Sequence, residues 1–97
     1  MPLRTVDDIN DDELENCFDG TTDIFMVRDI LTKPSVINDE GYVDIDQFAS
    51  WFAYELEGFI DADEDTEEWE EANDNNISWG ESIAMNINDA LDVLEEN

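Results

Sequence analysis

Apolar residues recur at helical spacing between Asp44 and Gly58. They stand at i, i+3, i+4, i+7 and i+11, which places them on one stripe of an amphipathic helix. The members of this stripe are Ile45, Phe48, Ala49, Phe52 and Leu56. Trp51 lies beside the stripe and widens the apolar face, and Gly58 is a suitable C-terminal stop. The pattern predicts a helix over this stretch.

A second amphipathic pattern begins at Ser78. Ser78 and Glu81 have the S-x-x-E spacing of a capping box, which predicts a helix that starts there. Its buried stripe would consist of Ile83, Ile87, Ala90, Leu91 and Leu94. Several acids occupy the other positions and should face water, namely Asp89, Asp92, Glu95 and Glu96.

A shorter helix is expected near the N-terminus. Asn10 can cap it, and the acids at 11–13 would stand in the first turn, where the helix dipole favours negative charge. Gly20 would end the helix. Its inward residues would be Leu14, Cys17 and Phe18.

A further short helix should follow, with Thr22 as its cap and Pro34 beyond its end. Its inward residues would be Ile24, Val27, Ile30 and Leu31. The run IFMV at 24–27 could instead form a strand, but Gly41–Asp44 is the one clear candidate for a partner strand. We therefore favour the helix.

The stretch 61–74 is the most acidic part of the chain, and its only apolar residues are Ala62, Trp69 and Ala72. A short helix from about Glu64 to Ala72, held to the core by Trp69, is one interpretation, and a loop is the other. Like charges four residues apart on a helix cost about 0.2–0.5 kcal/mol per pair, so a helix here would need tertiary support. Trp69 and Trp79 could also anchor an interface, although a core contact is the simpler interpretation.

These patterns predict one domain over residues 1–97, a mainly α-helical bundle of four to five helices with room for a minor β element. The chain is 41% apolar, which favours a folded protein over a disordered one. The single Cys17 excludes an intramolecular disulfide and is expected in the core. No apolar run approaches the roughly 20 residues of a membrane span, and the N-terminus lacks the apolar stretch of a secretory signal. We expect a cytoplasmic protein without membrane contact.

The charge of the chain bears most directly on its function. The chain has 29 acids against three basic residues, Arg4, Arg28 and Lys33, for a net charge of −26. Every position after Lys33 lacks Lys and Arg. Self-repulsion of this size destabilises a compact state, so stability alone does not explain it.

Catalysis is not expected. The chain contains no His, and Cys17 therefore has no His partner to activate it. No Gly-rich phosphate loop or nucleophile elbow occurs in the sequence. We predict that the protein is not an enzyme and carries no cofactor.

Two stretches of the sequence are candidates for calcium binding. The stretch Val36–Phe48 resembles an EF-hand loop in its second half, with Gly41 at the turn, but Val36 and Gln47 stand at positions one and twelve, where Asp and Glu are the usual ligands. A second candidate starts at Asp61 and has Thr66 in place of the Gly and Ala72 at position twelve. We predict no specific metal site, and keep a degenerate EF-hand-like calcium-binding module as an alternative.

Recognition of a partner through charge is the remaining class of function. Acids three or four residues apart on a helix lie about 5–6 Å from each other, close to the spacing of phosphates along a DNA strand. In its small size, its acidity, its near-absence of Lys and Arg and its helical acid spacing, the chain resembles the DNA-mimic proteins of phages and mobile elements. That class includes anti-restriction and anti-CRISPR proteins.

The resemblance implies an inhibitor that occupies the nucleic-acid-binding site of a host defence nuclease or CRISPR effector, in the host cytoplasm, with no direct nucleic-acid binding of its own. An acidic adaptor or chaperone for a basic DNA-binding protein is the alternative that shares every charge feature, and adaptation to a salty cytoplasm is another. A homodimer is a further candidate partner, through Trp51, Tyr54 and Met85. The expected partner-binding acids are Asp61, Asp63, Glu64, Asp65, Glu67, Glu68, Glu70, Glu71, Asp74, Glu81, Asp89, Asp92, Glu95 and Glu96.

Overall fold

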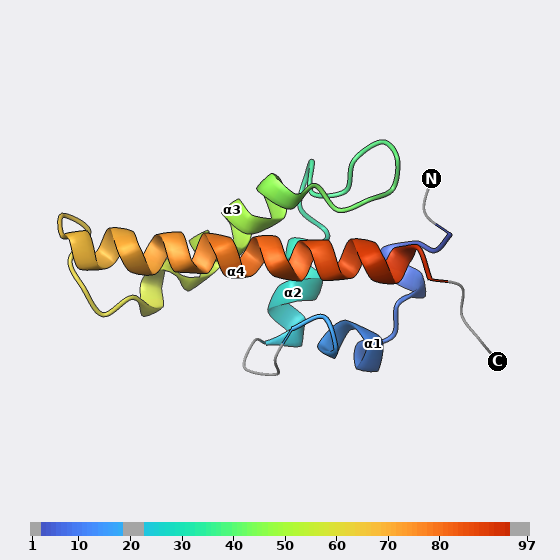
Figure 1. Ribbon diagram of the computed structural model, residues 1–97, viewed down its shortest axis with the longest axis horizontal. Coiled ribbons are helices and arrows are strands. Elements are labelled where there is room, and N and C mark those ends of the chain that lie inside the picture. The colour runs from blue at the N-terminus through green and yellow to red at the C-terminus, as the bar shows by residue number, and fades with distance from the viewer. Residues whose placement is uncertain (1–2, 19–22, 94–97) are drawn as a thin grey trace.

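The computed structural model describes residues 3–18 and 23–93, and in this part of the chain the fold is helical (Figure 1). Its α-helices are α1 (Asp11–Glu15), α2 (Ile24–Ile30), α3 (Ile45–Leu56) and α4 (Glu67–Leu91), and its 3-10 helices are η1 (Val6–Asp8) and η2 (Glu57–Phe59). An isolated antiparallel bridge between Ile37 and Val43 is the one β feature of the described residues. The prediction of a mainly α fold with four to five helices is confirmed.

Helix α4 runs along the length of the molecule. Its 25 residues span about 37 Å at the usual rise per residue, and the molecule measures 49 × 27 × 17 Å. In Figure 1, α3 begins above α4 and passes behind it, and α1 and α2 lie below α4, α1 towards its C-terminal end. The N-terminal half of α4 reaches the far end of the molecule, where the chain following η2 turns back into it.

The continuity of α4 corrects the sequence analysis. Ser78 does not start a helix but stands in the middle of α4, and the true cap is Thr66, whose Oγ1 accepts a hydrogen bond from the Trp69 backbone N–H at 3.3 Å. The stretch 64–72 is therefore helical from Glu67 onward. The two helices that the sequence predicted, near 64–72 and from Ser78, are one continuous helix. Its physical basis is the absence of Pro and Gly between positions 67 and 79, together with an inward stripe that continues through Ala72.

Helices α3 and α4 pack closely at Gly80. A Cβ at this position would lie 2.9 Å from the Ala49 Cα and 3.0 Å from the Phe52 Cβ, so only glycine fits without a shift. Phe52, which takes part in this contact, also stacks with Phe48 at 6.1 Å and meets the Trp79 ring edge-on at 5.2 Å. The predicted stripe of α3 forms this core, with Phe48, Ala49 and Phe52 all buried.

The predicted ends of α2 and α3 need adjustment. Asp23 caps α2 by accepting from the Phe25 N–H at 2.9 Å, so the cap is not Thr22; Thr22 and Gly20 lie outside the described residues. The strand alternative for 24–27 is wrong, because these residues begin α2. Helix α3 ends at Leu56, and Gly58 belongs to η2 rather than forming the stop.

The N-terminal segment closes the core against the end of α4. Backbone N–H groups of Leu3 and Arg4 both donate to the Leu91 carbonyl at 3.0 Å. The buried Arg4 guanidinium binds both carboxylate oxygens of Glu13, at 2.6 and 2.7 Å, and donates to the Asp8 carbonyl. Asn10 caps α1 as predicted, accepting from the Glu13 N–H.

Candidate partner-binding surface

Nine of the expected partner-binding acids gather at one end of the long axis. They come from the turn after η2 and from the first two turns of α4, and every one of them is exposed. We call this set the acidic end: Asp61, Asp63, Glu64, Asp65, Glu67, Glu68, Glu70, Glu71 and Asp74. Figure 1 shows this end projecting beyond α3.

Thr66 fixes the shape of the acidic end. Besides capping α4, its hydroxyl donates to the Asp63 carbonyl at 2.6 Å and its backbone N–H donates to the same oxygen at 3.0 Å. The turn at 63–66 is therefore tied directly to the first turn of α4. The acids that precede Thr66 are therefore joined to those that follow it through the backbone at Thr66.

The first turn of α4 has a structural reason to be acidic. Glu67, Glu68 and Glu70 stand where the helix dipole favours negative charge, typically by 0.3–1 kcal/mol each at low salt. Glu71 and Asp74 lie beyond that turn, one and two turns from Glu67 on the same face. The dipole therefore explains part of the acidic end, and the remaining acids need another explanation.

The acids near the other end of α4 are separate from the acidic end. Asp74 and Asp89 are fifteen positions apart, which corresponds to about 22 Å along the helix. The exposed residues between them on the outward face are uncharged, namely Asn75, Ser78, Ser82 and Met85. Glu81 is half-buried on the flank of the helix. The structure therefore places Glu81, Asp89 and Asp92 apart from the acidic end. Glu95 and Glu96 lie outside the described residues.

Asp92 takes part in the fold. Its carboxylate accepts a hydrogen bond from the Tyr42 hydroxyl at 2.5 Å, and this bond raises the pKa of Tyr42 above its ordinary value. One turn earlier, the Asn88 side chain accepts from the Val43 N–H at 2.8 Å and donates to the Val43 carbonyl at 3.0 Å. The C-terminal end of α4 therefore holds the loop that precedes α3.

All three basic side chains pair with acids near the N-terminus. The ion pairs between described residues join Arg4 to Glu13, Arg28 to Asp11 and Lys33 to Asp29, at 2.6, 3.0 and 3.4 Å. Arg4 lowers the pKa of Glu13, mainly through the direct hydrogen bond. Among the residues that the structure describes, no ion pair reaches the acidic end.

The EF-hand-like loop uses its polar groups for its own structure. Val36, at position one, is fully buried, and Asp44 caps α3 by accepting from the Gln47 N–H. The Asn38 carboxamide oxygen accepts from the N–H groups of Glu40 and Tyr42 at 3.0 and 3.1 Å. Gly41 has the positive φ of 91° that the turn position requires.

The second half of the other calcium candidate is helical. Its positions from Glu67 onward belong to α4, so they do not form a coordinating loop. Within residues 3–18 and 23–93, no group of three or more His, Cys, Asp or Glu side chains is placed to hold a metal ion.

Cys17 is buried, as predicted. Burial raises the pKa of its thiol, and the nearby charges of Glu13 and Asp89 raise it further. The Sγ atom contacts the Glu13 carbonyl at 3.5 Å. These surroundings favour the protonated thiol, which is the unreactive form.

The aromatic residues proposed for a homodimer differ in exposure. Tyr54 and Met85 are 64% and 48% exposed, but Trp51 is half-buried. The Trp51 ring is engaged inside the molecule, edge-on with Tyr54 at 5.9 Å and with the Lys33 ammonium 5.1 Å above it. Tyr54 and Met85 are therefore the members of this set that remain available to a partner.

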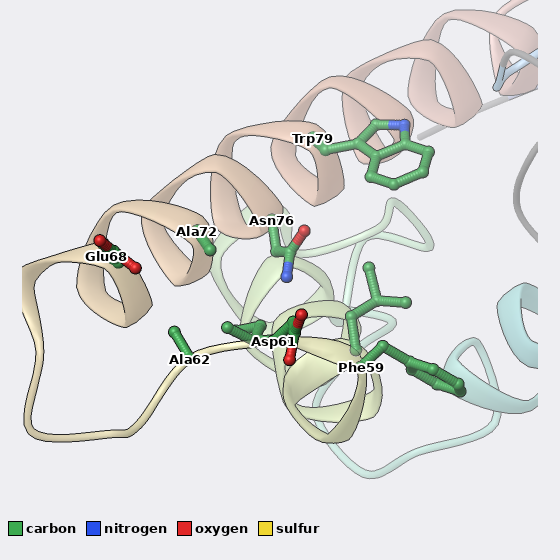
Figure 2. Close-up of a pocket in the computed structure, with 9 residues that line it drawn as sticks. Phe59, Asp61, Ala62, Glu68, Ala72, Asn76 and Trp79 are labelled. Carbon is green, nitrogen blue, oxygen red and sulfur yellow. The ribbon is translucent and has the colours of Figure 1, made fainter.

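An apolar hollow that the sequence analysis missed adjoins the acidic end. It has a volume of about 440 Å³ and opens to solvent between α4 and the chain around η2. Figure 2 shows Glu68, Ala72, Asn76 and Trp79 along the α4 side, with Phe59, Asp61 and Ala62 opposite. Leu56 and Ile60 complete the lining. The apolar pair Phe59–Ile60 directly before the acidic stretch was the available sequence signal.

No family model, curated protein or solved structure matches the chain. The described part of the chain also contains no helix that is both long enough and apolar enough to span a membrane.

Proposed function

We propose that the protein is a DNA mimic that inhibits a DNA-binding protein by occupying its nucleic-acid site with the acidic end. One observation carries this proposal: nine exposed acids stand together at one end of the molecule, and no ion pair among the described residues reaches them. A basic DNA-binding groove supplies the missing counter-charge.

The spacing of the acids supports mimicry. Glu67, Glu71 and Asp74 follow one another along one face of α4, at intervals of about 5–6 Å. This is close to the separation of phosphates along one DNA strand. The acids at 61–65 add charge beside this row, so the acidic end presents a broad negative surface rather than a single line.

Anchoring of α4 supports the proposal as well. The C-terminal half of α4 is packed against α3 around Gly80, and the N-terminal half continues the same helix. The direction of the projecting acids is therefore set before a partner arrives, which reduces the ordering entropy lost on binding.

The resemblance to phage and mobile-element inhibitors suggests the target class. We infer a host restriction or CRISPR effector, bound in the host cytoplasm, and an inhibitor that performs no chemistry itself. Steric and electrostatic blocking of the groove is sufficient for inhibition, because substrate DNA and the inhibitor need the same basic residues.

The decisive experiment is competition with DNA. The immobilised protein is used to capture binders from nuclease-treated host lysate, and each captured protein is then challenged with duplex DNA and with rising salt. We expect a nucleic-acid-binding protein that duplex DNA displaces and that high salt releases. Capture that persists beside bound DNA, or that is indifferent to salt, would contradict mimicry. An acidic adaptor would instead release an active target to the DNA.

A matched pair of variants places the binding surface. Glu67, Glu68, Glu70 and Glu71 are changed together to Gln in one variant, and four exposed acids elsewhere are changed in the other: Asp12→Asn, Glu15→Gln, Asp39→Asn and Glu40→Gln. Both variants lose the same net charge. We expect the first to weaken target binding far more than the second, and an equal loss would show that only total charge matters.

A further inference from the structure

The hollow beside the acidic end has a composition that DNA mimicry alone does not require. Most of its lining is apolar, from Leu56, Phe59, Ile60, Ala62, Ala72 and Trp79. Phe59, at its edge, is 81% exposed, so its ring is accessible to a partner. DNA phosphates have no counterpart to this apolar surface.

Acids border the hollow on both sides. Asp61 and Glu68 are among its lining residues, and the rest of the acidic end continues from them along the turn and α4. Its apolar floor is thus combined with a negative rim. The segment that complements this combination carries an apolar side chain flanked by Lys or Arg.

We infer that the hollow receives one apolar side chain from a Lys- and Arg-rich segment of the target protein. The inference rests on the proposed function and adds to it the chemistry of the segment that is bound. Flanking cations meet Asp61 and Glu68, while the apolar side chain contacts Ala72, Ile60 and Trp79. Interfaces commonly concentrate their binding energy in such an anchor surrounded by polar contacts.

Charge argues against the other occupants. A second copy of this chain would bring a net charge of −26 to an already negative rim, and an anionic lipid surface would be repelled in the same way. The hollow is open, so it would leave most of a small molecule exposed to water, whereas ligand pockets usually bury most of their ligand. A basic protein segment covers the floor and the rim together.

The Trp79 ring is well placed to report on occupation. It lines the hollow and is held by its edge-on contact with Phe52 at 5.2 Å. The other two tryptophans, Trp51 and Trp69, do not line the hollow. The three indole N–H signals in a ¹⁵N-labelled sample therefore distinguish binding in the hollow from binding elsewhere.

The test uses two labelled peptides of Lys, Arg and Ser that differ at one central residue, Leu in one and Ser in the other. Their dissociation constants for the wild-type protein are measured by fluorescence anisotropy at about 0.05 M and about 0.5 M NaCl. We expect the Leu peptide to bind about tenfold more tightly at both salt concentrations, because partial burial of one Leu contributes about that factor. We also expect the Trp79 indole signal to shift most.

Two variants localise the effect. Ala72→Gln introduces a polar side chain on the wall of the hollow, and Ser78→Gln introduces the same side chain on the outward face of α4. We expect Ala72→Gln to abolish the preference for the Leu peptide and Ser78→Gln to retain it. Circular dichroism confirms that both variants are helical, and the comparison of peptides on the wild-type protein does not depend on either variant.

The outcomes separate this inference from the proposed function. Equal binding of the two peptides, or a Leu preference unaffected by Ala72→Gln, would overturn the inference while leaving charge-driven binding intact. Salt-independent binding of the Ser peptide would instead contradict the proposed electrostatic function, whatever the effect of the Leu residue.

Discussion

The two ends of α4 use their polar residues in opposite ways. At the C-terminal end, the Leu91 carbonyl holds the N-terminal segment, Asn88 holds Val43, and Asp92 binds Tyr42. At the N-terminal end, the charged side chains are exposed, and no residue of α4 before Gly80 is buried, although the structure describes the whole helix. One helix thus packs the core with its C-terminal half and exposes charged side chains from its N-terminal half.

The largest expected difference in the free energy of unfolding is between isoleucine-to-alanine substitutions in the two halves of α4. Ile87→Ala removes a fully buried side chain and should lower the free energy of unfolding by about 3 kcal/mol, within the range for such cavities. Ile77→Ala, at a half-buried position in the other half, should cost much less. Urea unfolding followed by circular dichroism measures both. Equal losses would show that the N-terminal half is as important to the fold.

The close approach at Gly80 should be nearly as sensitive. Gly80→Ala forces a methyl group against the Ala49 backbone, and overpacking of this kind costs about 1–3 kcal/mol, more than alanine gains in helix propensity. Gly58→Ala is the matched control, because no atom lies within 4 Å of a Cβ placed there. Thermal unfolding should show a clear drop in Tm for Gly80→Ala alone. An unchanged Tm would mean that α3 and α4 can separate without loss.

The position of the helix start can be tested by removing hydroxyl groups. Thr66→Ala removes the cap of α4 and should cost about 1 kcal/mol. Ser78→Ala, inside the helix, should be neutral or slightly stabilising because alanine has the higher helix propensity. Chemical denaturation of the two variants decides the matter, and a larger loss for Ser78→Ala would restore a helix start at Ser78.

The smallest effect is the pH dependence of the Arg4–Glu13 pair. Because Arg4 lowers the pKa of Glu13 below its ordinary value of 4.5, the pair stabilises the fold fully above that pH and loses its contribution as the pH falls through the lowered pKa. The stability difference between wild type and Glu13→Gln should therefore shrink on acidification. Glu15→Gln removes one carboxylate from the same helix and corrects for net charge. A difference that grew towards low pH would contradict this assignment.

The sequence predicted α3 well and α4 poorly, for a physical reason. Every inward position of the α3 stripe is apolar, so its periodicity is unambiguous. In the first half of α4 the inward side includes Asn73 and Asn76, and hydrophobicity alone does not mark it. Ser78 and Glu81 then imitate a capping box in the middle of the helix.

The sequence also indicated only part of the candidate binding surface. The exposure of acids 61–74 follows from their number and from the lack of basic residues in that part of the chain. Their separation from Asp89 and Asp92 depends on the length of α4, which the sequence analysis divided in two. The apolar hollow depends on how η2 folds back beside Ala72, a tertiary arrangement that no local pattern contains.

The absence of buried residues before Gly80 in α4 also bears on how this protein can evolve. Substitutions among the exposed acids at 67–74 disturb no packed core, so many sequences there are compatible with the same fold. Under the proposed function, selection by a changing target can therefore alter the exposed half while the half that begins at Gly80 stays constant. A single helix divided in this way lets recognition diversify without loss of a stable scaffold.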